Sequence, residues 1–311
     1  MKIFFAPLEG ITNFVSTNTH NEMFGCIDEY YSPFITPSED DKVNRKGLND
    51  IIPENNPNIV IKPQVLTNSS EAFLKFTEKI MAVGYDEVNL NFGCPSQTVV
   101  KKGKGSGFLK DPDKVDSFLY DVFKEHPMKI SVKTRTGFLE GSEMEQLMKI
   151  YNKYPLELLI IHPRTRSDFY NGMPDMAVFE KAFYSSKNPV CYNGNIDTKE
   201  DYERIEKSFP TLGYVMLGRG LIKNPALGRE IRGGERITTE EIVAFSKKLA
   251  DNYQLTLRSE TFTLNKLKEV WMYMIQNYPE EKKIFKTIRK ANKLCDFMGA
   301  IECLPELAIS N

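Results

Sequence analysis

Eight short apolar runs alternate with helix-like segments through the first 235 residues, and this alternation constrains the fold more than any other feature. Buried parallel strands joined by crossover helices produce such a pattern. The sequence therefore predicts an α/β fold in which eight strands close into a (β/α)8 TIM barrel. The predicted strands are Ile3–Ala6, Glu29–Ser32, Ile59–Val65, Glu87–Asn91, Ile130–Thr134, Leu158–His162, Val190–Asn193 and Tyr214–Leu217.

Helical periodicity lies between most of these runs, and the pattern changes after about residue 235. The helices predicted within the barrel include Glu71–Val83, Asp113–Lys124, Glu143–Tyr154 and Lys199–Lys207. Beyond it the sequence predicts helices without strands, over Thr239–Leu257, Thr261–Gln276 and Glu281–Met298. We therefore expect two domains, a barrel over residues 1–235 and a small all-helical domain over residues 236–311.

Composition narrows the functional classes. The chain has 311 residues, 41% of them hydrophobic, and a net charge of −1, so a nucleic acid would have to be bound by a local basic patch. The five cysteines form no C-x-x-C pair, so no metal site is expected. No run reaches the ~18 apolar residues of a membrane span, and the N-terminus lacks a signal-peptide core. We expect a cytoplasmic protein with no membrane contact and no stable protein partner.

Polar and turn-forming residues follow the predicted strands at the ends where active sites of this fold lie. Seven such strand ends predict a shared ligand. Glycines after the seventh and eighth strands indicate a phosphate group on that ligand, although tight turns alone would also use glycine. The residues at these ends are Pro7, Leu8, Glu9, Gln64, Asn91, Cys94, Lys133, Arg135, His162, Arg164, Arg166, Asn193, Gly194, Asn195, Gly218 and Arg219.

One of these ends carries a single thiol. The apolar alternation over residues 88–92 predicts a strand, which Gly93 and Pro95 end. Cys94 lies between these two breakers and is followed by a basic, glycine-rich loop over residues 101–107. Free cysteine is commonly a small buried hydrophobe, but this position suits chemistry better than core packing.

A second basic feature lies in the last predicted helix. Cations recur there at spacings of three and four residues, along one helix face. A solvated helix surface is the ordinary interpretation, and a phosphate contact gains weight only if the active site requires a nucleic acid. These cations are Lys282, Lys283, Lys286, Arg289, Lys290 and Lys293.

The motifs, taken together and in this order, resemble those of the tRNA-dihydrouridine synthases, which are FMN-dependent barrels with a C-terminal helical domain. The resemblance runs from Ala6-Pro7 through the barrel, and the helical tail agrees in type. The matching blocks are Asn91-Phe92-Gly93-Cys94-Pro95 with its basic loop, Lys133-Thr134-Arg135, His162-Pro163-Arg164-Thr165-Arg166, Asn193-Gly194 and Gly218-Arg219-Gly220.

The resemblance implies reduction of a specific uridine in tRNA to 5,6-dihydrouridine, with FMN as cofactor and NADPH or NADH as transient reductant. Hydride would pass from reduced FMN to C6 of uracil, and Cys94 would give a proton to C5. An ordinary thiol has a pKa of about 8.5, so it is protonated at neutral pH yet acidic enough to protonate an enolate. We therefore expect Cys94 to be a thiol and not a thiolate.

The resemblance also assigns the other strand-end residues. Lys133 would lie beside the flavin edge that becomes anionic on reduction. The remaining FMN contacts would come from Pro7, Leu8, Glu9, Gln64, His162, Asn193, Gly194, Asn195, Gly218 and Arg219. The substrate contacts would come from Asn91, Lys101, Lys102, Arg135, Arg164, Arg166, Lys286, Arg289 and Lys290. Arg164 and Arg166 fit either the FMN phosphate or the RNA.

Two other readings remain open. An FMN-dependent barrel reductase of a small molecule would share Lys133 and the phosphate site, but would not need the basic loop or the basic helix. A tRNA-binding protein that has lost catalysis would not need Cys94, Lys133 and His162 together. A yellow purified protein would argue against that second alternative.

Overall fold

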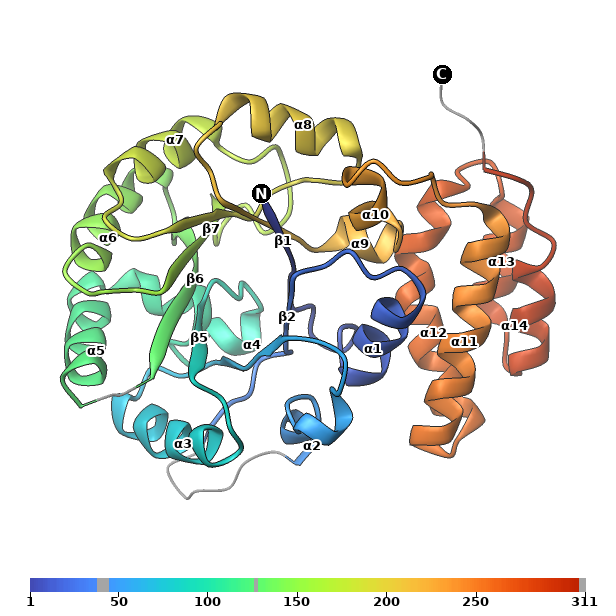
Figure 1. Ribbon diagram of the computed structural model, residues 1–311, viewed down its shortest axis with the longest axis horizontal. Helices are drawn as coiled ribbons and strands as arrows, with labels where there is room; N and C mark the ends of the chain where they lie inside the picture. The colour runs from blue at the N-terminus through green and yellow to red at the C-terminus, as the bar shows by residue number, and fades with distance from the viewer. Residues whose placement is uncertain (38–44, 126–127, 308–311) are drawn as a thin grey trace.

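Nine parallel strands form the barrel in the computed structural model, which describes residues 1–37, 45–125 and 128–307 (Figure 1). Their order around the barrel is β3-β2-β1-β9-β8-β7-β6-β5-β4, so the chain runs round it in sequence. The predicted TIM barrel is confirmed. The strands are β1 (Lys2–Phe5), β2 (Glu29–Tyr31), β3 (Ile61–Lys62), β4 (Gln64–Val65), β5 (Glu87–Phe92), β6 (Lys129–Gly137), β7 (Leu158–Thr165), β8 (Val190–Tyr192) and β9 (Tyr214–Leu217).

Strands β3 and β4 together occupy the place of the single strand predicted over Ile59–Val65. Pro63 separates them because it has no N–H to give to the sheet. Its carbonyl still accepts a hydrogen bond from the N–H of Asn89 (2.8 Å), so the chain crosses from β2 to β5 without leaving the wall. An isolated bridge between Ile35 and Val65 completes the closure on the other side.

Helices surround the strands, as crossover connections require. The four predicted barrel helices are present as α3 (Ser70–Ala82), α5 (Pro112–Glu125), α6 (Met144–Tyr151) and α8 (Lys199–Ser208). Local side chains cap them; for example, the Ser69 side chain accepts from the Ala72 N–H at the start of α3. The other barrel helices are α1 (Phe14–Met23), α2 (Arg45–Asn49), α4 (Gln97–Val100), α7 (Met176–Ser185), α9 (Arg219–Lys223) and α10 (Leu227–Ile231).

Two buried layers hold the barrel together. The larger lies between the strands and the helices, and the smaller fills the barrel interior with Phe4, Tyr31, Ile160 and Met216, each at most 1% exposed. These side chains fill the interior of the barrel below the carboxyl ends of the strands.

The C-terminal region is helical, as predicted, but the prediction of a single last helix is wrong. Glu281–Met298 is not one helix; it is α13 (Lys282–Lys290) and α14 (Leu294–Ile301), after α11 (Thr239–Leu257) and α12 (Glu260–Met274). The break arises because Lys268 Nζ donates a hydrogen bond to the Ala291 carbonyl, and the Glu260 carboxylate accepts one from the Leu294 N–H (2.7 Å). Tertiary contacts from α12 therefore end α13, and no local sequence signal reveals them.

The helical region packs against the barrel beside α1, α9 and α10 (Figure 1). The rings of Phe24 and Phe245 meet at 5.5 Å between centroids. The Asn13 amide donates to Tyr253 Oη at 2.8 Å, and the Lys266 ammonium donates to the Gly10 carbonyl at 2.7 Å. The last of these contacts ties α12 to the loop that follows β1, which carries part of the predicted site.

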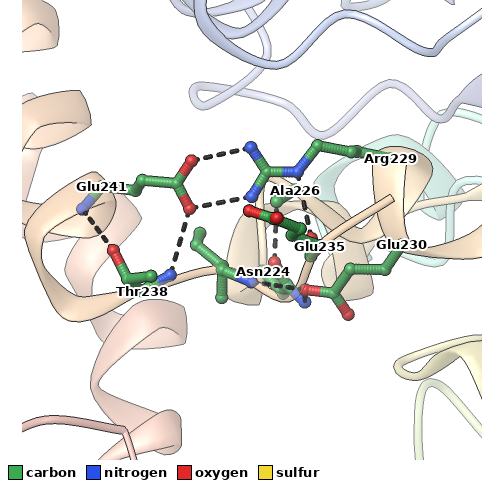
Figure 2. Close-up of polar contacts among 8 residues, drawn as sticks. Asn224, Ala226, Arg229, Glu230, Glu235, Thr238 and Glu241 are labelled. Carbon is green, nitrogen blue, oxygen red and sulfur yellow. Dashed lines mark hydrogen bonds and ion pairs between the residues drawn. The ribbon is translucent and has the colours of Figure 1, made fainter. Parts of the chain in front are cut away.

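Figure 2 shows how the connection between α10 and α11 is fixed. The Arg229 guanidinium donates to both carboxylate oxygens of Glu241, at 2.7 and 2.8 Å, and to the Glu235 carbonyl at 3.1 Å. Glu241 also accepts from the Thr238 N–H, closing the N-terminal capping box of α11. We propose that the domain boundary lies between residues 235 and 236, because the connection between α10 and α11 contains no strand or helix.

Candidate active site

A cavity of about 440 Å³ opens at the carboxyl ends of the strands. All eleven predicted cofactor residues line it: Pro7, Leu8, Glu9, Gln64, Lys133, His162, Asn193, Gly194, Asn195, Gly218 and Arg219. Cys94, Asn91 and Arg135 line it as well, and Tyr273 reaches it from α12. The cavity is therefore walled by the barrel and by the helical region together.

The other predicted substrate residues lie outside the cavity. Lys101 and Lys102 are exposed on the turn after α4, and Arg166 lies in the loop after β7. Arg164 is buried behind His162. Lys286, Arg289 and Lys290 are exposed on α13, and Ile288 is the buried residue of that helix.

A tight turn presents Cys94 to the cavity. The Asn91 side-chain oxygen accepts from the N–H groups of Gly93 (3.1 Å) and Cys94 (2.9 Å), which forms an Asx turn at the end of β5. The Cys94 carbonyl accepts from the Ser106 N–H (3.0 Å) and hydroxyl (2.8 Å). Gly105 has φ of 56°, and a Cβ there would lie 2.8 Å from the Cys94 carbonyl oxygen. The basic loop is thus built against the thiol.

A chain of buried amides orients Asn91. Ser131 Oγ accepts from Asn89, whose oxygen accepts from Gln64 (2.7 Å), whose oxygen in turn accepts from the Asn91 amide (2.7 Å). Each amide in the chain can face only one way, because its oxygen and its nitrogen have different partners. Strand-end residues that look like separate ligand contacts in the sequence therefore form one positioning network.

Cys94 is protonated at neutral pH. Burial raises the pKa of its thiol above the ordinary value, and this outweighs the lowering by the Ser96 backbone and by the charges of Arg135 and Lys133. This agrees with the expectation of a thiol and fits a proton donor better than a nucleophile.

Lys133 is poised between its two charge states. Burial, and secondly the charge of Arg135, lower the pKa of its ammonium to about 8. An anionic group in the cavity would raise that pKa again and would bind the charged form. Lys133 is therefore suited to an anion or to a group that becomes anionic.

His162 is neutral and in one tautomer. Burial lowers its pKa well below 6.5, and the charges of Arg135, Lys133, Arg164 and Arg219 lower it further. Arg164 Nη1 lies 3.0 Å from His162 Nε2, and a guanidinium can only donate. Nε2 is therefore the acceptor, which leaves the proton on Nδ1.

Arg164 also organises the other side of the site. It donates to the carbonyls of Asn171 (3.2 Å) and Gly172 (2.5 Å) and to the Asn195 side-chain oxygen (3.2 Å). The same Asn195 oxygen accepts from Arg219 at 3.1 Å. Arg164 thus has its donors occupied by the protein, while Arg219 faces the cavity beside the turns of Gly194 and Gly218.

Two aromatic residues that line the cavity, both in the loop after β7, were not among the residues predicted from the sequence. The Tyr170 ring lies within 4.9 Å of the Arg219 guanidinium carbon and 5.3 Å of that of Arg135, measured to the ring centroid. Phe169 lines the cavity next to it. Both are exposed aromatics directly after a strand-end motif, and that combination was the available signal.

Two absences hold for the part of the chain that the structure describes. No cluster of three or more His, Cys, Asp or Glu side chains there has the arrangement of a metal site. Within the same ranges, none of the helices combines the length and apolar character needed to span a membrane.

Comparisons with known proteins identify the family and support the fold. The tRNA-dihydrouridine(16) synthase of Shigella flexneri is 25% identical, over 98% of each chain, and that of Aquipseudomonas alcaligenes is 26% identical, over 93% of this chain and 95% of its own. Among solved structures, morphinone reductase with tetrahydroNAD superposes with a TM-score of 0.51 at 12% identity, covering 76% of this chain and 88% of its own. Histamine dehydrogenase from Rhizobium sp. 4-9 gives 0.55 at 9% identity, covering 75% and 45%; both show the fold alone. The family profile described as dihydrouridine synthase matches residues 4–302, and the chain belongs to that family.

Proposed function

We propose that this protein reduces a uridine of tRNA to 5,6-dihydrouridine, with FMN as cofactor and NADPH or NADH as reductant. The observation that carries the proposal is the placement of the Cys94 thiol in the same cavity as Lys133, His162 and Arg219. The curated relatives are named for position 16, so that uridine is the one to examine first. The cytoplasm is the proposed location.

The cavity residues fit FMN by the chemistry of their donors. Arg219, with the backbone turns of Gly194 and Gly218, would hold the phosphate, because these groups supply a cation and open backbone at one end. At the other end Lys133 would meet the flavin edge that carries charge after reduction. His162 would offer its Nδ1–H, and Gln64 and Asn193 would supply side-chain amides between them.

FMN held by these residues and reduced by NADPH or NADH would supply the hydride chemistry directed at C6 of uracil. Charge then builds toward O4 of the uracil, and C5 must receive a proton. Cys94 would donate that proton, because its thiol is protonated at neutral pH and is held by the Asn91 turn. Arg135, which donates to the Gly93 and Thr165 carbonyls (2.9 and 2.7 Å), would fix the strand ends on both sides of the substrate.

The RNA would be held outside the cavity. A stacked uridine has to be turned out of its helix to reach Cys94, which costs a few kcal/mol. Lys101 and Lys102 beside the thiol and Lys286, Arg289 and Lys290 on α13 would return part of that cost through phosphate contacts.

The proposal is tested by the oxidation half-reaction. Purified protein should carry FMN, and NADPH should bleach it under anaerobic conditions. Added tRNA that lacks dihydrouridine should restore the flavin absorbance, whereas the same tRNA after full modification should not. Reoxidation by neither tRNA would favour the small-molecule reductase, and a colourless protein that binds tRNA would favour the lapsed enzyme.

A further inference from the structure

Two loops at the rim of the cavity expose large apolar side chains. They are the loop after β6, with the exposed Leu139 next to the half-buried Phe138, and the loop after β7, with Phe169, Tyr170 and Met173. Leu139 is 65% exposed, Met173 77% and Phe169 38%. Together the loops hold four of the thirteen large hydrophobic side chains that are exposed in the described ranges. The concentration lies at the mouth of the site.

The two loops are fastened to each other and are not free segments. The Arg166 N–H donates to the Gly137 carbonyl at 3.0 Å, and Ser167 donates to the Phe138 carbonyl from both its N–H (3.2 Å) and its hydroxyl (3.1 Å). Asp168 accepts from the Thr165 N–H at 2.7 Å. The exposed side chains are therefore presented on a fixed support.

Cations alternate with these aromatic rings. The Arg166 guanidinium carbon lies 5.6 Å from the Phe138 ring centroid and 5.4 Å from that of Phe169, and Lys110 Nζ lies 4.3 Å from Phe138. No carboxylate of the described residues forms an ion pair with Arg166 within 4.0 Å, and its buried Nε has no acceptor among them. Its charge is available to a ligand.

Phe169 has a backbone conformation that a phenylalanine rarely adopts. Its φ is 54°, in the left-handed region, where a side chain with Cβ is strained. Glycine or asparagine would fit that conformation better, so local folding does not explain the aromatic side chain. Strain of this kind concentrates at functional sites.

We propose that Phe138, Leu139, Arg166, Phe169 and Met173, here called the rim platform, bind the base of the nucleotide next to the target uridine. This rests on the proposed function. When the uridine leaves its stack, its neighbour loses a stacking partner, and an aromatic surface at the cavity mouth replaces it. Arg166 and Lys110 would meet the phosphates of the same nucleotides.

An RNA strand fits the platform better than the nicotinamide dinucleotide does. Lys110 ends the segment that begins with Lys101 and Lys102, so cations lie at both ends of the stretch that leads from the thiol loop to the platform. A stretch with cations at both ends matches a polymer of phosphates. A reductant that only visits the flavin does not require it.

The test is a pair of substitutions at Phe169. Phe169→Asn keeps the left-handed backbone and removes the ring, and Phe169→Trp keeps an aromatic surface. Fluorescence anisotropy with FMN-loaded full-length protein should show the tRNA Kd rising about tenfold for Phe169→Asn, since a lost base stack has that order of effect. Phe169→Trp should bind within about twofold of wild type. Tyr184→Ala is the matched control, because this 66% exposed aromatic lies near the end of α7 that leads into β8, away from the cavity.

A second arm locates the contact. After the modified uridine has been mapped, an abasic nucleotide is placed on either side of it. At one of these two positions, the abasic nucleotide should raise the tRNA Kd of the wild-type protein but should not raise that of Phe169→Asn any further. Additive losses at both positions would overturn the platform.

The remaining outcomes separate the claims. An unchanged tRNA Kd for Phe169→Asn in a protein that makes dihydrouridine would overturn the platform alone. In Phe169→Asn, a fall in the rate of flavin reduction by NADPH that matches the rise in tRNA Kd would assign the surface to the dinucleotide. That result would also overturn the platform. A wild-type protein that neither binds nor reduces tRNA would contradict the proposed function and the platform with it.

Discussion

The charge of the Lys133 side chain depends on the ligand that the cavity binds. Its ammonium is buried beside Arg135, and its pKa of about 8 shows that the site disfavours a positive charge until an anion arrives. A site prepared in this way binds a group that becomes negative more strongly than the neutral group. That is the electrostatic preference an enzyme needs in order to favour reduced flavin.

Replacing Lys133 with Met should stabilise the flavin-free protein at neutral pH. The folded-state pKa lies below the unfolded value of 10.5, so the unfolded state binds more protons between about pH 8 and 10.5. The unfolding free energy of wild type should therefore rise with pH across that window, relative to Lys133→Met. At pH 7 the variant should be up to about 3 kcal/mol more stable in urea denaturation, because each unit of pKa difference corresponds to about 1.4 kcal/mol. A difference between the two proteins that does not change with pH would contradict the assignment.

Replacing Arg164 with Met should change the protonation of His162. The substitution removes a donor to Nε2 and a nearby positive charge, so the pKa of His162 should rise toward 6.5 while burial keeps it below that value. Ring ¹⁵N shifts should report the Nδ1–H tautomer in wild type and a mixture in the variant, with His162→Gln used for assignment. A ring that is protonated on Nε2 in wild type would refute this account.

At the scale of elements, the loop from α4 through the helical turn at Gly105–Lys110 is a support for Cys94. Glycine at position 105 lets the loop pass this close to Cys94, because a Cβ there would lie 2.8 Å from the Cys94 carbonyl oxygen. Gly84 provides a comparison, because its φ is 103° and no atom lies within 4 Å of a Cβ placed there.

Both Gly105→Ala and Gly84→Ala should cost about 1 kcal/mol or more of stability through backbone strain. Gly105→Ala alone should also lower the rate of uridine reduction at saturating tRNA, by at least tenfold if the thiol moves by about 1 Å. The measurements are urea unfolding and single-turnover kinetics. Equal effects of the two variants on the rate would show that the loop does not position Cys94.

The elements also show how far sequence reasoning reaches. The strands could be predicted because buried parallel strands read as apolar runs between helices, and the run over Tyr214–Leu217 coincides with β9. The break between α13 and α14 could not, because Lys268 and Glu260 impose it from another helix. The residues lining the cavity were predictable as strand ends, whereas the burial of Arg164 behind His162 depends on the path of the loop after β7.

At the scale of the whole molecule, the helical region completes the cavity and carries a separate cationic face. Tyr273 lines the cavity from α12, and the Arg229–Glu241 pair fixes the connection to the barrel. These contacts place the helical region that carries the α13 cations against the barrel that carries Cys94. A tRNA bound by both surfaces would be oriented over the thiol.

Neutralising Lys101 and Lys102 together with Lys286 and Arg289 should weaken tRNA binding and flatten its salt dependence. Each lost phosphate contact should reduce the slope of log K against log salt concentration by about 1. The control is Lys129→Gln with Lys187→Gln, compared per cation removed, since these exposed lysines lie near the amino ends of β6 and β8, opposite the cavity. An unchanged slope in the fourfold variant, or an equal change per cation in the control, would show that these basic surfaces do not contact the RNA.

The measurement that bears most directly on the central claim is the mass of uridine in tRNA after reaction. Unmodified tRNA is incubated with NADPH and either wild-type protein or Cys94→Ala, and the nucleosides are then analysed by mass spectrometry. We predict dihydrouridine with wild type and a loss of at least 100-fold in its rate of formation with Cys94→Ala, in line with removal of a general acid. Dihydrouridine formed equally well by Cys94→Ala would show that the proton comes from elsewhere, and flavin reduction without any change in tRNA would show that the substrate is a different molecule.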